Sequence, residues 1–86
     1  MSISYRNMQA FLCVAESATF AEAAEKLFVT QPALSSSIKK MEEQLGGQLF
    51  SRTTRRVQLT PEGETFLPHA RRLLHDWDDA VEGVQN

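Results

Sequence analysis

Apolar residues recur at helical spacing in the stretch from residue 30 to residue 45, TQPALSSSIKKMEEQL. Their intervals of four, three and four residues place Leu34, Ile38, Met41 and Leu45 on one face of an α-helix. The opposite face has short or cationic side chains and no carboxylate before Glu43; its members are Pro32, Ser35, Ser36, Lys39 and Lys40. Thr30 is suited to cap this helix, and Pro32 falls in the first turn, where its missing N–H removes no helical hydrogen bond. We predict a helix with one buried face and one slim polar face.

Two shorter helices are predicted before it. Met8, Phe11 and Ala15 keep helical spacing, which predicts a first helix from about residue 4 to residue 16. The pair Thr19 and Glu22 is a capping-box pattern that opens a second helix over residues 20–27. The inward face of this second helix is small, and consists of Phe20, Ala23, Ala24 and Leu27. Residues 28–30 suffice only for a turn, so the two helices form a helix-turn-helix; the same pair also occurs as a plain packing unit in all-α proteins.

A short β-hairpin is predicted after Gly46 and Gly47, which can end the third helix. Residues 48–52 and 57–59 are β-prone, and the residues between them carry hydroxyls and arginines. Pairing of the two pieces would put Leu49 or Phe50 and Leu59 over the core and leave the arginines free. Such a hairpin next to a helix-turn-helix is typical of a wing that contacts the DNA backbone or minor groove, although a solvated basic loop is the simpler alternative. The residues of this wing that we expect to contact DNA are Arg52, Thr54, Arg55 and Arg56.

The last predicted helix begins at Thr60-Pro61-Glu62 and runs to about residue 84. Its apolar residues step by four, three, four, three and four, with a second row beside them at intervals of seven. The first row is Phe66, Ala70, Leu73, Trp77, Ala80 and Val84, and the second is Leu67, Leu74 and Val81. This stripe is too long for a small domain to cover, so we expect it to form a dimer interface rather than to pack only within the chain.

These elements predict a mainly α fold. Residues 1–60 would form a winged helix-turn-helix of three helices and a two-stranded β-hairpin wing, and residues 61–86 a long dimerisation or linker helix. Eighty-six residues with 42% apolar content allow one compact core. Cations outnumber acids seven to five in residues 1–60, whereas acids outnumber cations six to two in residues 61–86. The formal net charge of −2 therefore conceals a positive end.

Other chemistry finds little support in the sequence. The lone Cys13 cannot form an intrachain disulfide or a four-ligand zinc site, which favours a reducing, cytoplasmic location. No apolar run approaches the length of a membrane span, and the first residues lack a signal-peptide profile. His69 and His75 are six residues apart, which is not a metal-ligand spacing. With no paired carboxylates, no nucleophile beside a histidine and no glycine-rich phosphate loop, we expect neither a cofactor nor an enzyme.

The polar face of the helix at residues 30–45 suits a groove walled by phosphates, because its first turns are slim and uncharged and lysines follow. We interpret it as a DNA-recognition helix; a surface helix with a solvated polar face is the alternative.

The chain resembles the N-terminal DNA-binding domain of LysR-type transcriptional regulators over nearly its whole length. The matching residues are Phe11-Leu12-x-Val14-Ala15-Glu16, Thr19-Phe20, Ala23-Ala24, Leu27, Thr30-Gln31-Pro32-Ala33-Leu34-Ser35-x-x-Ile38, Glu42, Leu45-Gly46, Leu49-Phe50-x-Arg52-x-x-Arg55, Leu59-Thr60, Gly63 and Phe66-Leu67-x-x-Ala70-Arg71. The resemblance implies that the helix from residue 30 enters the major groove of double-stranded DNA, with Thr30, Gln31, Pro32, Ser35 and Ser36 at the DNA surface. It also implies that Arg52 and Arg55 act in the wing, and that the last helix pairs antiparallel with that of a second copy.

Two departures from the family pattern matter. Ser36 stands where relatives often carry arginine, which leaves the preferred DNA sequence open. Family members also continue into a C-terminal domain that binds a small-molecule effector, whereas this chain stops at the dimerising helix and resembles an isolated domain. We expect a homodimer that reads an imperfect inverted repeat, with a tetramer left open for a full-length protein. The alternative is a protein-interaction module that has lost DNA binding, which the overall negative charge would suit.

Overall fold

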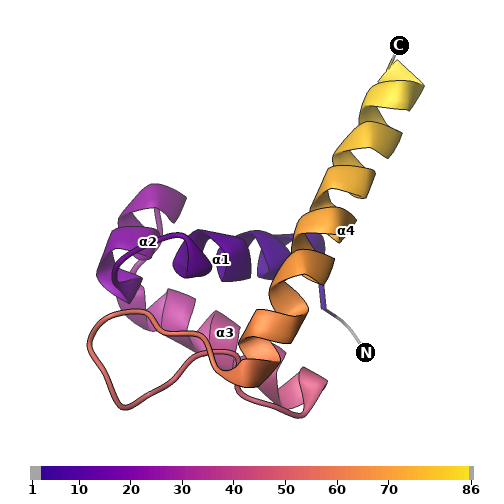
Figure 1. Cartoon of the computed structure of the whole chain (residues 1–86). Coiled ribbons are helices and arrows are strands. Elements are labelled where there is room, and N and C mark those ends of the chain that lie inside the picture. Colours follow the sequence, from indigo (N-terminus) through magenta and orange to yellow (C-terminus); the bar gives the residue numbers. More distant parts are fainter. Residues whose placement is uncertain (1–2, 86) are drawn as a thin grey trace.

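The computed structural model describes residues 3–85, which fold into a three-helix body and one long projecting helix (Figure 1). The helices are α1 (Tyr5–Ala15), α2 (Phe20–Leu27), α3 (Gln31–Leu45) and α4 (Pro61–Gln85). The helix-turn-helix predicted from the sequence is α2 and α3 with the turn between them. The mainly α architecture and the bounds of all four helices agree with the predictions to within one or two residues.

Local caps explain where α2 and α3 begin and end. The Thr19 hydroxyl accepts a hydrogen bond from the Glu22 N–H at 3.1 Å, and the Thr30 hydroxyl accepts one from the Ala33 N–H at 3.2 Å. Gly46 ends α3 with φ of 80°, a left-handed conformation that glycine adopts without strain. In contrast, the capping box of α1, in which Ser4 and Asn7 exchange hydrogen bonds, was not part of the sequence prediction.

The core lies where α1 meets the other three helices. Its largest fully buried side chains are Phe11, Phe50, Ile38, Met41 and Val14. Aromatic rings connect the elements: the Phe11 centroid is 5.4 Å from that of Phe50 and 5.2 Å from that of Phe66. Ala23 and Ala24 of α2 are buried, so their small side chains let α2 approach the rest of the body closely.

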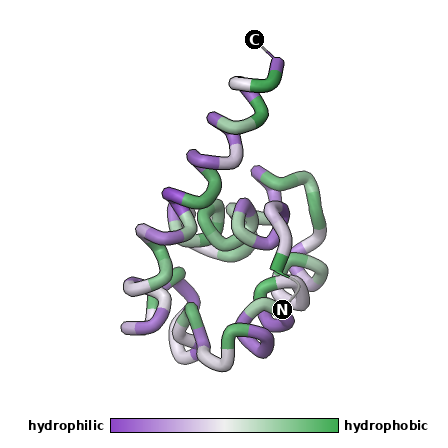
Figure 2. The backbone as a smooth tube through the Cα atoms, turned by 90° about the vertical axis from the view of Figure 1, so that its right-hand side faces the viewer, coloured by the Kyte–Doolittle hydropathy of each residue, from purple (hydrophilic) through white to green (hydrophobic). Residues whose placement is uncertain are grey.

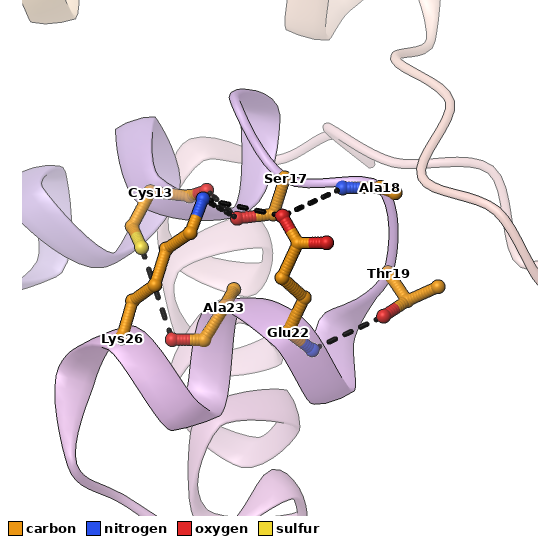
Figure 3. A network of polar contacts seen from close by, with 7 residues as sticks. All are labelled: Cys13, Ser17, Ala18, Thr19, Glu22, Ala23 and Lys26. Atoms are coloured by element: carbon orange, nitrogen blue, oxygen red, sulfur yellow. Dashed lines mark hydrogen bonds and ion pairs between the residues drawn. The ribbon is translucent and has the colours of Figure 1, made fainter.

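The turn between α1 and α2 is held by a polar network (Figure 3). The Ser17 hydroxyl donates to the Cys13 carbonyl at 2.6 Å and receives a hydrogen bond from the Lys26 ammonium at 3.3 Å. Glu22 pairs with Lys26 at 3.2 Å and accepts from the Ala18 N–H at 3.4 Å. The hydrogen bond from Lys26 and then that from the Ala18 N–H lower the pKa of Glu22 below its usual range. The network therefore connects the end of α1 with the first two turns of α2.

The segment between α3 and α4 corrects one sequence prediction. Among residues 3–85 it contains no β-strand, only one isolated antiparallel bridge between Phe50 and Leu59. The predicted burial is confirmed, because Leu49 and Phe50 are 2% and 0% exposed and Leu59 packs against the core. The two predicted pieces pair only at the base of the loop, where the Ser51 N–H is donated to the Gln58 carbonyl at 2.8 Å and the Thr60 N–H to the Leu49 carbonyl at 3.0 Å. The pairing does not extend into two strands, and the Val57 N–H is donated to the Ala18 carbonyl at the α1–α2 turn, 2.9 Å away. Residues 51–58 form a wide loop whose two ends are bonded to the body and whose tip projects beyond it (Figure 1).

The long helix α4 lies against α1 at its beginning and extends beyond the body at its end (Figure 1). Ala70 and Leu74 are buried, whereas Leu73, Trp77, Val81 and Val84 are exposed. Hydrophobic and hydrophilic residues alternate along the projecting part (Figure 2). Within residues 3–85 no helix has the length and apolarity that crossing a bilayer requires.

Candidate nucleic-acid interface

Helix α3 presents the polar face that the sequence predicts. Leu34, Ile38 and Met41 are 3%, 1% and 1% exposed, and their burial turns the opposite face outward. On that face the exposed residues are Gln31, Pro32, Ser36, Lys39 and Lys40, with Ser35 half-buried among them. Thr30 is also exposed, and its hydroxyl is engaged in capping α3. The face therefore begins with hydroxyl and amide groups and continues with two ammonium groups.

A shallow groove joins the first turn of α3 to the loop between α3 and α4. It is lined by Thr19, Phe20, Ala21, Gln31, Ser35, Ser51, Arg52, Thr54 and Arg55. Five residues predicted separately from the sequence, in two segments of the chain, thus meet around one concavity. The groove offers an amide, hydroxyls and guanidinium groups and has no carboxylate in its lining, which suits an anionic polymer with hydrogen-bonding edges.

The other predicted residues lie outside this groove. Ser36 and Lys40 line a second hollow, towards Asn7 of α1, and Lys39 lines a third together with Glu42 and Arg52. Arg56 is exposed, and its charge contributes to lowering the pKa of Glu22, so it lies on the side of the loop that faces α2. Ser36, Lys39 and Lys40 extend the polar surface further along α3.

Arg52 differs from the expectation that all the loop arginines are free. Its guanidinium forms an ion pair with Glu42, whose side chain is 6% exposed, and lies over the Phe20 ring with Cζ 5.7 Å from the ring centroid. The prediction of a free arginine is therefore wrong for Arg52. Arg55, in contrast, is exposed and has no ion pair within residues 3–85.

Glu42 is the residue of this region whose role the sequence reasoning missed. Its carboxylate accepts hydrogen bonds from the N–H groups of Leu49 and Phe50 at 2.7 and 3.2 Å, in addition to the pair with Arg52. A signal was present, because Glu42 follows Ile38 by one helical turn and therefore lies on the apolar face of α3. An acid at such a position needs a buried partner.

The predicted dimer-interface residues on α4 divide into covered and uncovered groups. Ala70 is 0% exposed and Leu74 9%, and Phe66 and Leu67 pack partly against the core. Ala70 belongs to the buried core and has no surface left for a second chain, so its assignment to an interface is wrong. Five of the predicted interface residues are exposed on α4: Leu73, Trp77, Ala80, Val81 and Val84.

Comparison with known families and relatives places this geometry in context. Residues 5–64 match the family model described as bacterial regulatory helix-turn-helix protein, lysR family. The HTH-type transcriptional regulator YbhD of Escherichia coli, described as uncharacterized, is 49% identical over 80 residues, which are 93% of this chain and 25% of the relative. The HTH-type transcriptional regulator CfxR of Cupriavidus necator is 42% identical over 84 residues, 98% of this chain and 26% of the relative. The chain thus spans about a quarter of the length of these relatives.

Solved structures show the same arrangement. The DNA-binding domain of BenM in complex with benA site 1 DNA has a TM-score of 0.91 and 40% identity, with 95% of both chains covered. The CbnR DNA-binding domain in complex with DNA has a TM-score of 0.90 and 33% identity, with 95% of this chain and 94% of that chain covered. The family match over most of the body, together with this similarity, shows that the chain belongs to the LysR family of bacterial regulatory helix-turn-helix proteins.

Proposed function

We propose that the chain is the sequence-specific DNA-binding domain of a bacterial transcription regulator, and that it acts in the cytoplasm by binding and not by catalysis. The observation that carries this proposal is the outward polar face of α3, which meets the loop arginine Arg55 around one groove. The similarity to two domains solved in complex with DNA supports it. The lone thiol Cys13 and a DNA partner both suit the cytoplasm.

In this proposal α3 lies in the major groove of the DNA. Gln31, Ser35 and Ser36 face the base edges, where a glutamine amide can pair with N6 and N7 of adenine. Thr30 and Pro32 approach the same surface at the first turn of α3. Lys39, Lys40, Thr54, Arg55 and Arg56 lie against the phosphates and set the register of the helix.

The exposed part of α4 would join two copies of the chain. Leu73, Trp77 and Val81 are 50%, 57% and 41% exposed, which is a large apolar surface for a helix that projects beyond its own body. A two-fold pair would present two α3 helices to half-sites about one helical turn apart, or a multiple of it, so the preferred site would be an imperfect inverted repeat.

Selection of bound duplexes from a random pool, followed by mutation, tests the proposal. Gln31→Ala should weaken binding to the selected site by about 1–3 kcal/mol and binding to random DNA by much less. Lys40→Ala should weaken binding to both by a similar factor, because phosphate contacts carry no sequence information. Equal losses on both duplexes for both variants would contradict this division of roles.

The overall net charge of −2 favours one other candidate function, that of a protein-docking module. Six of the eleven acids, however, follow Pro61 and so lie on α4, away from the groove. Mobility shifts of genomic fragments at low salt separate the two candidates, because a docking module would shift none of them.

A further inference from the structure

The Glu42 carboxylate connects the end of α3 with the start of the loop that follows. Oε2 accepts from the backbone N–H groups of Leu49 and Phe50, and Oε1 accepts from the Arg52 guanidinium. Hydrogen bonds to a charged group are stronger than those between neutral groups, and burial of Glu42 strengthens them further. One side chain of α3 thus holds three residues of the loop.

Arg52 carries this connection on to α2. Its guanidinium lies over the ring of Phe20, the first residue of α2, and that ring contacts Phe50 with centroids 5.6 Å apart. A cation over an aromatic face adds an attraction of its own. If Arg52 turned to a phosphate, Glu42 would stay buried without its ion-pair partner, which is strongly unfavourable. The charge of Arg52 is therefore neutralised by Glu42 within the protein, although the Arg52 side chain is 37% exposed.

We propose that Arg52 is a positioning residue and not a DNA contact: together with Glu42 it holds the loop against α2 and α3 and thereby places Arg55 at the phosphate backbone. The proposal rests on the DNA-binding function proposed above. Arg52 and Arg55 line the same groove, three residues apart, but only Arg52 has an acidic partner among residues 3–85. The two arginines thus have different roles despite their identical chemistry.

Glu42→Gln separates positioning from direct contact by the sign of its effect. If Arg52 bound phosphate directly, removal of an acid beside it would free its charge and strengthen DNA binding. If the pair positions the loop, the same change loosens Arg52 and weakens binding. The glutamine carbonyl can still accept from the N–H groups of Leu49 and Phe50, so the fold has less to lose than in Arg52→Gln.

The experiment measures fluorescence anisotropy of a labelled duplex, taken from the random-pool selection, between about 50 and 200 mM salt. The slope of log K against log salt counts neutralised phosphates, at about 0.9 for each. Arg55→Gln should lower the slope by about one per protomer and the affinity by about tenfold. Arg52→Gln and Glu42→Gln should each lower the slope by a similar amount, because Arg55 loses its place.

The double variant Arg52→Gln with Arg55→Gln decides the question. Positioning predicts that it binds as Arg55→Gln does, within about twofold, with the same slope. Two independent phosphate contacts predict instead a slope lowered by about two per protomer and an additive loss of about a hundredfold. That result, or tighter binding by Glu42→Gln, would overturn the inference.

Thermal unfolding followed by far-UV circular dichroism controls for loss of structure. Partial unfolding would reduce the active fraction without changing the salt slope, so a lowered affinity with an unchanged slope in both Arg52→Gln and Glu42→Gln would also overturn the inference. If Arg52→Gln does not fold, the sign of the Glu42→Gln effect and its slope decide. Failure of the wild-type chain to bind any duplex would instead overturn the proposed function itself.

Discussion

The two halves of α4 share one apolar pattern but lie in different surroundings. In residues 61–74 the chain itself covers the pattern except at Leu73, which is 50% exposed: Ala70 is 0% exposed, and the Phe66 ring lies 5.2 Å from that of Phe11. In residues 75–85 it is uncovered, with Trp77 and Val84 57% and 88% exposed. Helical spacing therefore predicts an apolar stripe that is unfavourable in water, but it does not indicate whether the same chain or another molecule buries it.

Exposure, and not side-chain size, distinguishes the two halves, because the packed half buries the large Leu74 as well as the small Ala70. In the packed half Gly63 lies directly against the backbone of Leu49, and Ala70 is fully buried. The projecting half instead presents Trp77 and Val81, which would fill space between two helices. The packed half is therefore covered within the chain, and the exposed residues of the projecting half are those that we propose to meet a second copy.

The largest effect is expected where the apolar stripe is exposed at the junction of the two halves, at Leu73 and Trp77. Leu73→Gln combined with Trp77→Gln should weaken dimerisation by on the order of 4 kcal/mol, about a thousandfold, because a two-fold interface loses each side chain twice. Sedimentation velocity across a concentration series measures this. The body should remain folded by circular dichroism, and a dimer of unchanged affinity would show that this surface is not the interface.

In the packed half, Gly63→Ala should reduce the free energy of unfolding by about 3 kcal/mol. An added Cβ at Gly63 would lie 2.1 Å from the Leu49 carbonyl oxygen and 2.9 Å from Leu59 Cδ2, and a backbone oxygen cannot move aside cheaply. Urea denaturation at a fixed protein concentration gives the value. A loss below about 1 kcal/mol would mean that α4 and the loop can separate easily.

The matched change in the projecting half is Gly83→Ala. Nothing lies within 4 Å of a Cβ added there, so the substitution should stabilise the chain slightly, by about 0.5 kcal/mol, because alanine loses less conformational freedom in a helix. The same titration measures it. Destabilisation by Gly83→Ala would show that this part of α4 is closely covered in solution.

The smallest effect concerns the contact between the projecting half and α1. The Tyr5 hydroxyl donates to Asp78 at 2.8 Å, and the Tyr5 and Trp77 rings are 5.6 Å apart. The hydrogen bond to Asp78 first, then burial and the charge of Asp78, raise the pKa of Tyr5 above its ordinary value of 10.0. The raised pKa means that this contribution to stability is present below pH 10 and is lost as the pH rises through the folded-state pKa.

Absorbance titration of the phenolate tests this contact directly, because Tyr5 is the only tyrosine in the chain. Asp78→Asn should move the pKa of Tyr5 back towards 10.0. An identical titration in both proteins would indicate that the projecting half is not held to α1 in solution.

Local signals made the helices predictable. Thr19, Thr30 and Gly46 each form a hydrogen bond with a backbone group no more than four residues away. Both partners of each cap therefore lie within one short stretch of sequence, where the pattern can be recognised. The polar face of α3 was predictable for the same reason: it lies opposite the apolar stripe of the same helix, and burial of that stripe turns it towards solvent.

Distant partners account for what the sequence did not reveal. The hairpin was predicted on the assumption that neighbouring β-prone segments pair along their length, but they pair only around Phe50 and Leu59, and the Val57 N–H is donated to Ala18 at the α1–α2 turn. Arg52 was expected to be free because its partner, Glu42, is in the preceding helix and ten residues away. Neither contact follows from propensity or spacing, because both depend on how the helices pack.

The loop after α3 is attached to the body on both sides of its tip, by Arg52 to Glu42 and by Val57 to Ala18. Residues 53–56 lie between these attachments, so insertions or deletions there would leave the core bonds intact. In the proposed complex a longer tip would reach additional nucleotides. Changes in tip length would therefore alter the length of DNA that such a domain covers while α3 stays the same.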